Sequence, residues 1–163
     1  MTRTRPSPLS LALLLLPIAL QIGCATRNIP NTRVEDNSQN REIVEFMEVY
    51  RNAVQDRDIA ALLRMASPNY FDDMGTPSGD DDVDYETLKA GLQRLRNEVI
   101  AARYQISYRG LTYIHDGKVL VDVLYTGWFK VDTPEGPQWR RRLEPHRIVL
   151  AREGEQLRIL SGM

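Results

Sequence analysis

Apolar side chains between residues 40 and 66 recur at steps of three and four, which is the spacing of one face of an α-helix. The first such face consists of Ile43, Met47, Tyr50 and Val54. Asp58 is a suitable N-cap for a short second helix, Ile59–Ala66. Ser67-Pro68 ends it, because a proline disfavours the α conformation at the residue before it. The pattern predicts two consecutive helices.

A third and longer helix is predicted after Tyr70-Phe71, which has the composition of a short strand. Asp84 is its expected N-cap. The helical period is then kept for five turns by Tyr85, Leu88, Leu92, Leu95, Val99 and Ala102. Gly91 is the weak point of this helix, since glycine has a low helix propensity.

From Arg103 onward the apolar period changes from helical spacing to two, which predicts β-strands. The Asp116-Gly117 pair lies between two alternating runs and is a strong hairpin signal. Further strands are expected over residues 119–129, 139–151 and 157–161, with turns at 133–137 and 153–154. Such strands cannot bury their apolar face alone, so the helices must cover it. The predicted class is α+β, with three N-terminal helices packed on a curved antiparallel meander sheet.

The stretch Leu11–Cys24, LALLLLPIALQIGC, is uncharged and follows Arg3 and Arg5. Its apolar core of ten residues would span only about 15 Å as a helix, too short for a stable membrane span. A basic start, an apolar middle and small residues at the end are typical of a cleavable export signal covering residues 1–23.

Gly23-Cys24 resembles the lipobox of bacterial lipoproteins. The resemblance implies that Cys24 becomes the N-terminus and receives a diacylglyceryl thioether and an N-linked acyl chain such as palmitate. Ala25 in place of Asp implies the outer membrane, with the protein facing the periplasm or the surface. The family usually has Leu where this chain has Gln21. The alternative is ordinary cleavage after the small-x-small run Gly23-Cys24-Ala25, giving a soluble periplasmic or secreted protein.

Residues 24–39 are polar and without periodicity, so we expect a lipidated cysteine followed by a tether. The alternative is an ordered arm packed on the domain. About 120 further residues, 40–163, suffice for one hydrophobic core and not for two. Cys24 is the only cysteine, so no disulfide within the chain can support that core.

The charge balance argues against a nucleic-acid partner. Loss of residues 1–23 removes Arg3 and Arg5 and no acid, which takes 21 basic residues to 19 against 22 acidic ones. A net charge of about −3 is too small to favour binding to a polyanion.

The stretch Tyr50–Asp73, YRNAVQDRDIAALLRMASPNYFDD, resembles the nuclear-transport-factor-2-like superfamily, and the order of elements extends the resemblance over residues 40–163. The resemblance implies a cone-shaped fold with an internal pocket, and a possible homodimer through the sheet. The superfamily includes SnoaL-type polyketide cyclases, steroid isomerases, dehydratases and proteins without catalysis. Fold alone therefore does not select a function.

The steroid-isomerase branch implies roles for four residues. Tyr50 matches a first-helix tyrosine that stabilises an enolate, and Asp72 or Asp73 lies near the position of the general base. His146 stands approximately where the family has a second carboxyl group. The alternative is that Tyr50 is a core residue and that His146 is structural, paired with Glu144 or an aspartate.

Strand alternation predicts further pocket residues. If Ile148 and Leu150 face the helices, then Arg142, Glu144 and His146 point inward as well. Tyr125 and Trp128 are expected to share this space.

Two charged clusters have a chemical and a simpler interpretation. Asp80, Asp82, Asp84 and Glu86 offer oxygen ligands for calcium, but the EF-hand order is absent and a solvated loop before a helix explains them equally. The arginines of residues 139–142, WRRR, could bind phosphate groups, or pair with cross-strand acids such as Asp122 or Asp132.

Two functions remain from the sequence. The first is a non-catalytic envelope lipoprotein whose domain binds a small apolar ligand or an envelope protein. The second is a small-molecule isomerase or cyclase with Tyr50, Asp72 or Asp73, and His146 in its pocket. Neither requires a cofactor.

Overall fold

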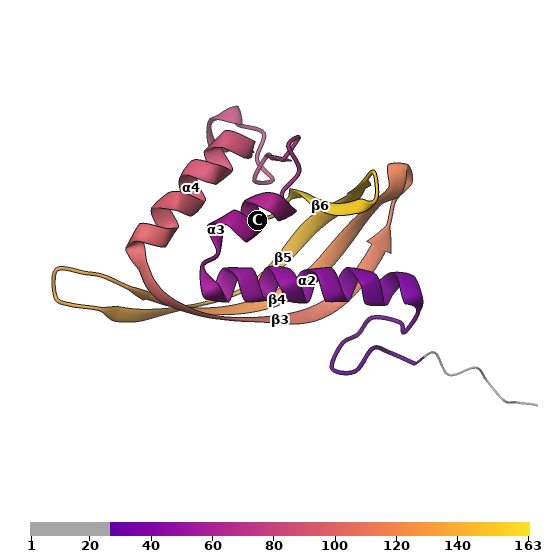
Figure 1. Cartoon of the computed structure of the whole chain (residues 1–163), viewed down its shortest axis with the longest axis horizontal. Coiled ribbons are helices and arrows are strands. Elements are labelled where there is room, and N and C mark those ends of the chain that lie inside the picture. The colour runs from indigo at the N-terminus through magenta and orange to yellow at the C-terminus, as the bar shows by residue number, and fades with distance from the viewer. Residues whose placement is uncertain (1–26) are drawn as a thin grey trace, which may run out of the picture.

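The computed structural model describes residues 27–163 and places three helices against one face of a four-stranded antiparallel sheet (Figure 1). The helices are α2 (Ser38–Asp56), α3 (Ile59–Met65) and α4 (Tyr85–Glu98). The sheet has the order β3 (Val99–Tyr113), β4 (Lys118–Val131), β5 (Gln138–Glu153) and β6 (Gln156–Ser161). Two short strands, β1 (Phe71–Asp72) and β2 (Val83–Asp84), pair separately, and η2 (Gly79–Asp81) and η3 (His115–Gly117) are single 3₁₀ turns. The predicted α+β class is confirmed.

The capping residues expected from the sequence begin their helices. The Asp58 carboxylate accepts a hydrogen bond from the Ala61 backbone N–H, and the Asp84 carboxylate accepts one from Thr87. Each bond satisfies a donor that the first turn of a helix leaves free. Helix α2 begins two residues earlier than predicted, because the Asn37 side chain caps the Asn40 N–H.

The third helix is shorter than predicted, because β3 begins at Val99. The helical period extends through Val99 and Ala102, but both residues lie in the strand and pair with β4, Ala102 opposite Phe129. Val99 is 6% exposed, so the strand buries the same side chain that the helix would have buried. Val99 and Ile100 are both β-branched, which favours a strand. Pairing with β4 also provides hydrogen-bond partners for the backbone N–H and C=O groups of this segment.

The hydrophobic core lies between α2, α3 and the inner face of the sheet. Met47 from α2, Val121 from β4 and Leu150 from β5 are fully buried there. Ile148 is also buried, which confirms that this alternation of β5 faces the helices. The β3–β4 hairpin forms at the predicted Asp116-Gly117 turn, where both residues have positive φ.

Residues 27–37 fold onto the domain, so for these residues the expected free tether is wrong and the ordered arm is correct. The Ile29 N–H donates to the Val34 carbonyl, and Val34 is only 2% exposed. The Asn40 side chain fixes the arm by donating to the Glu35 carbonyl, and it accepts a hydrogen bond from the Tyr113 hydroxyl. The predicted signal and Cys24 lie outside the described residues.

Gly162 connects three parts of the fold. Its N–H donates to Asp72 Oδ2 at 2.7 Å, and its carbonyl lies 2.9 Å from His146 Nε2. Its φ of 84° is in the left-handed region, and a Cβ there would meet the Arg147 carbonyl oxygen and the Ile148 backbone. Only glycine fits this position without strain.

We therefore expect Gly162→Ala to lower the free energy of unfolding by about 2 kcal/mol or more, through the φ penalty and the backbone clash. Thermal or urea unfolding measures this change. Gly91→Ala is the matched control, because its added Cβ meets nothing within 4 Å. Removing a glycine from the middle of α4 should raise stability by up to about 1 kcal/mol. Equal stability of Gly162→Ala and wild type would contradict the assignment.

Candidate functional site

The inner face of the sheet carries a pocket of about 490 Å³ beyond the end of the buried core. Helices α2, α3 and α4 form one wall, and β3, β4 and β5 form the other. The apolar lining is Val54, Ile59, Leu62, Leu92, Leu95, Val99, Phe129, Val131 and Met163. The polar lining is Tyr50, Tyr104, Tyr125, His146, Arg57, Arg140 and Arg142. This size and mixture are typical of a site for a small molecule.

Four aromatic rings form a continuous row along the pocket. The ring centroids of Tyr50 and Tyr104 are 6.3 Å apart, those of Tyr104 and Tyr125 5.4 Å, and those of Tyr125 and His146 5.8 Å. Tyr50 and Tyr104 are buried, whereas Tyr125 and His146 are partly exposed. The row therefore runs from buried to partly exposed side chains, and it brings together Tyr50, Tyr125 and His146, which the sequence analysis expected in one pocket.

Burial raises the pKa of the hydroxyls of Tyr50 and Tyr104 far above the usual value; the neighbouring Tyr50 raises the pKa of Tyr104 further, whereas a hydrogen bond with Tyr104 partly opposes the rise at Tyr50. An ionised phenol at either position would lie in an apolar environment. Both groups therefore stay protonated throughout the physiological pH range, and they can donate hydrogen bonds but cannot act as bases.

Asp72 and Asp73 do not line the pocket. Asp72 Oδ2 accepts the Gly162 N–H, Asp72 Oδ1 accepts the Met74 N–H, and Asp73 Oδ1 accepts the Gly75 N–H. These bonds shape the loop after β1 and fix the end of β6. The two carboxylates predicted near the general base thus have structural roles in this geometry.

His146 points into the pocket as the alternation predicts, and its partner is the Gly162 carbonyl rather than an acid. A carbonyl can only accept, so Nε2 carries the proton in this hydrogen bond. The expected partner Glu144 instead accepts a hydrogen bond from the Tyr125 hydroxyl at 2.9 Å. Burial and this carboxylate raise the pKa of Tyr125, and the nearby Arg142 guanidinium opposes the rise.

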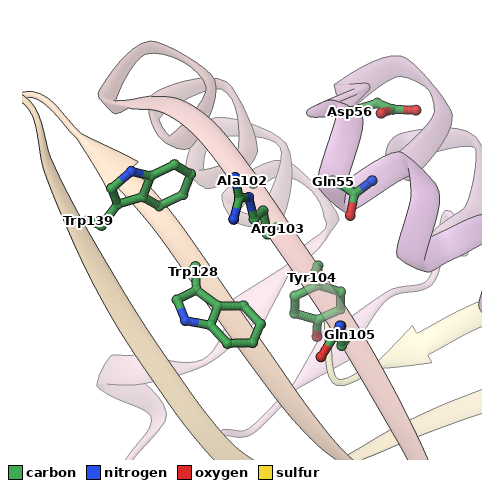
Figure 2. A pocket seen from close by; sticks show the side chains of 8 residues that line it. All are labelled: Gln55, Asp56, Ala102, Arg103, Tyr104, Gln105, Trp128 and Trp139. Atoms are coloured by element: carbon green, nitrogen blue, oxygen red, sulfur yellow. The ribbon is translucent and has the colours of Figure 1, made fainter.

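Trp128 lies on the other face of the sheet, so its expected place in the pocket is wrong. Residues of β4 that face the helices have odd numbers, as Val121, Val123 and Phe129 do, and Trp128 falls in the opposite set. Figure 2 shows Trp128 on β4 and Trp139 on β5 lining a second hollow with Arg103 from the edge strand β3.

This second hollow measures about 740 Å³, and besides its aromatic residues and Arg103 its lining includes Ala102, Gln105 and the α2 residues Gln55 and Asp56. The Arg103 guanidinium lies 5.4 Å from the Trp139 ring centroid, and that of Arg141 lies 5.8 Å from Trp128. These are cation–π contacts, so each arginine covers one of the indoles. Trp139 and Leu143 are still about half exposed. Self-association through the sheet stays a prediction.

The arginines of residues 139–142 divide between the two faces, as alternation requires. Arg140 and Arg142 line the inner pocket, and Arg141 covers Trp128 outside. The predicted partner Asp122 pairs with Arg147 instead, at 2.7 Å. Arg57 and Arg140 were missed as pocket residues, although the alternation that placed Arg142 inside also applies to Arg140.

The acidic loop does not gather a calcium site in the part of the chain that the structure describes. Asp84 is bound to Thr87 as the helix cap, and Asp80 lies beside Ser78 in η2. No group of three or more potential metal ligands is found among residues 27–163. In the same range, no helix is long and apolar enough to cross a membrane.

Comparison with known proteins identifies the fold. A candidate scytalone dehydratase from Novosphingobium aromaticivorans superposes with a TM-score of 0.64 at 8% identity, covering 76% of this chain and 80% of that one. A candidate calcium/calmodulin-dependent protein kinase II association domain from Xanthomonas campestris gives 0.60 at 14% identity, over 84% and 90%. A candidate aromatic ring hydroxylase from N. aromaticivorans gives 0.58 at 14% identity, over 79% and 96%.

The fold is the nuclear-transport-factor-2-like cone. The cone fold thus occurs in proteins named for catalysis and for assembly, so the function of this chain must be argued from its own site. No family model matches the sequence, and no curated protein matches it either.

The tyrosine row predicts alkaline sensitivity. A raised pKa in the folded state means that the unfolded chain loses its tyrosine protons first, so stability is complete below pH 10 and falls as the pH rises above it. Each buried tyrosine adds about 1.4 kcal/mol per pH unit to this fall.

Urea unfolding between pH 9 and 11 should show a smaller loss of stability with pH for Tyr104→Phe than for wild type. Phe129→Leu is the control, because it alters the same pocket without removing an ionisable group. An unchanged slope in Tyr104→Phe would mean that this hydroxyl ionises in the folded protein.

Proposed function

We propose that the protein is a cell-envelope lipoprotein whose cone domain binds a small, partly apolar ligand without transforming it. The observation that carries this proposal is the inner pocket, in which apolar walls surround hydrogen-bond donors. The hydroxyls of Tyr50 and Tyr104 can donate hydrogen bonds, Nδ1 of a neutral His146 can accept one, and the three arginines supply positive charge.

A binding role is favoured over an isomerase or cyclase because the two carboxylates expected near the general base, Asp72 and Asp73, lie outside the pocket. Proton abstraction requires a group within hydrogen-bond reach of the substrate, with a pKa near the working pH. Within the described part of the chain no aspartate or glutamate lines the pocket, and Asp72 and Asp73 are bound to backbone N–H groups elsewhere. The Nε2–H of His146 is donated to the Gly162 carbonyl, so on a neutral ring Nδ1 is a hydrogen-bond acceptor, and no carboxylate in the described residues is bonded to it.

The anchor is supported by the sequence of residues 11–24, an apolar stretch that ends in the lipobox-like Gly23-Cys24. Only three residue steps separate Cys24 from Arg27, so an acylated Cys24 could stand at most about 11 Å from the arm. The proposal therefore places the domain close to the lipid surface rather than on a long tether.

Metabolic labelling with radioactive palmitate tests the anchor. Wild type should incorporate the label and sediment with membranes, whereas Cys24→Ala should do neither, because it lacks the thiol that forms the thioether. An unlabelled wild-type protein would refute lipidation and favour ordinary cleavage and a soluble product.

Binding of the neutral fluorescent probe N-phenyl-1-naphthylamine tests the pocket. We expect saturable binding at one site per chain. Val54→Trp should weaken it about tenfold or more, because a larger side chain fills the cavity. Leu143→Trp is the matched control, since it adds similar bulk at an exposed position of β5 outside the pocket. Unfolding temperatures of both variants verify that they are folded. Absence of saturable binding by wild type would refute the ligand-binding proposal.

A further inference from the structure

We propose that the ligand of the inner pocket is a single-chain amphipathic carboxylate, with its apolar chain in the cone and its carboxylate between Arg140 and Arg142. This inference rests on the proposed function and adds the chemical class of the ligand. Charge, strand geometry and the shape of the pocket lead to it in turn.

The fixed charges that line the pocket have one sign. Arg57 comes from the α2–α3 junction, and Arg140 and Arg142 come from β5. None of the ion pairs formed among residues 27–163 uses any of these three guanidinium groups. An arginine keeps its charge at all physiological pH values, so this part of the cone has a positive potential that no protein carboxylate neutralises by direct contact.

Arg140 and Arg142 are placed to hold one anion between them. They are two residues apart on the same face of β5, which separates their Cα atoms by about 7 Å. Each guanidinium is a planar fork of N–H donors that matches the two oxygens of a carboxylate. On the neighbouring strand β4, Phe129 is paired with Arg140 and Gly127 is paired with Arg142. Gly127 has no side chain opposite Arg142, and the Phe129 ring occupies the position where its Cβ would be, which adds an apolar surface beside the two arginines.

The nearest acid on the same face is already engaged. Glu144 lies two residues after Arg142 on β5 and accepts a hydrogen bond from the Tyr125 hydroxyl at 2.9 Å. It forms no ion pair with Arg142 within 4.0 Å. Arg57 is also fixed, because its Nη1 donates to the Val99 carbonyl oxygen at 2.5 Å. Neither Arg140 nor Arg142 forms an ion pair among the described residues; Arg142 lies near the Tyr125 hydroxyl, and since each guanidinium has five N–H donors, both keep donors for a ligand.

The rest of the pocket fits a hydrocarbon body. Leu92 and Leu95 from α4 face Phe129 and Val131 from β4, and Val54 extends this wall on α2. An apolar chain between these side chains would remove both surfaces from water, and this is the favourable term in binding. A carboxylate at the arginine end would then gain charge-assisted hydrogen bonds that a neutral or cationic head group cannot form.

Affinities for three ligands with equal chains separate these contributions: decanoate, decanol and decyltrimethylammonium. Each is measured below its micelle concentration by displacement of N-phenyl-1-naphthylamine. The purified chain carries Cys24→Ala, so that it cannot be acylated at this position. We expect decanoate to bind at least about tenfold more tightly than decanol, and the cation to bind least. The advantage of decanoate should fall as sodium chloride is added, because salt screens the attraction.

The arginine variants give the decisive comparison. Arg140→Gln/Arg142→Gln should reduce the affinity for decanoate to that for decanol and leave decanol binding unchanged. Arg141→Gln is the matched control, since it lies between the two in sequence and on the opposite face of the sheet. Its affinities should equal those of wild type.

The outcomes distinguish the two proposals. Equal binding of decanol and decanoate would overturn the carboxylate inference and leave the ligand-binding function standing. Loss of the decanoate advantage in Arg141→Gln would also overturn it, because the attraction would then come from general surface charge. Failure of all three compounds and the probe to bind would refute the binding function itself.

Discussion

The structure depends on a mismatch in length between the sheet and the helices that cover it. Strands β3, β4 and β5 contain 14 to 16 residues and extend for about 50 Å, whereas the 19 residues of α2 extend for about 28 Å. One helix can therefore bury only part of the inner face. Helix α4 is inclined to the sheet, and the β4–β5 hairpin extends beyond it, as Figure 1 shows.

This mismatch divides the inner face into a core and a pocket. Where α2 and α3 meet the sheet, Val121, Ile148 and Leu150 are buried completely. Further along the same strands, Tyr125 and Phe129 are only partly covered, and Arg142 is exposed. The aromatic row connects the two regions, since Tyr50 at one end is buried in the core and His146 at the other end is partly exposed and lines the pocket. One continuous surface thus supplies both stability and a binding site.

The contacts that close the fold also determine what the pocket can do chemically. Gly162 accepts the Nε2–H hydrogen bond of His146 and donates to Asp72, which orients the imidazole ring and occupies the carboxylate away from the cavity. In a related arrangement with a free acid, the same cone would have a candidate base. Here the cavity is lined by tyrosine hydroxyls, the His146 ring and guanidinium groups, which can hold a ligand by hydrogen bonds and charge.

The sequence by itself determined the features that depend on near neighbours in the chain. Apolar spacing identified the helical and strand regions, Asp58 and Asp84 marked helix starts, and Asp116-Gly117 marked the main hairpin, because caps and turns are formed by residues a few positions apart. Alternation placed Arg142 and His146 on the inner face of β5. The same rule, applied consistently, would have placed Arg140 with them and Trp128 outside.

Only the tertiary structure decided where distant segments meet. Val99 and Ala102 fit both a helix and a strand, and pairing with β4 selected the strand. Residues 27–37 have no periodicity, yet Val34 is buried because its partners come from elsewhere in the fold. Asp72 could not be separated from a pocket acid by its sequence position, since its role follows from a hydrogen bond to Gly162, 90 residues away. Local patterns fix the faces of each element, and long-range packing fixes which of those faces is covered and which remains open.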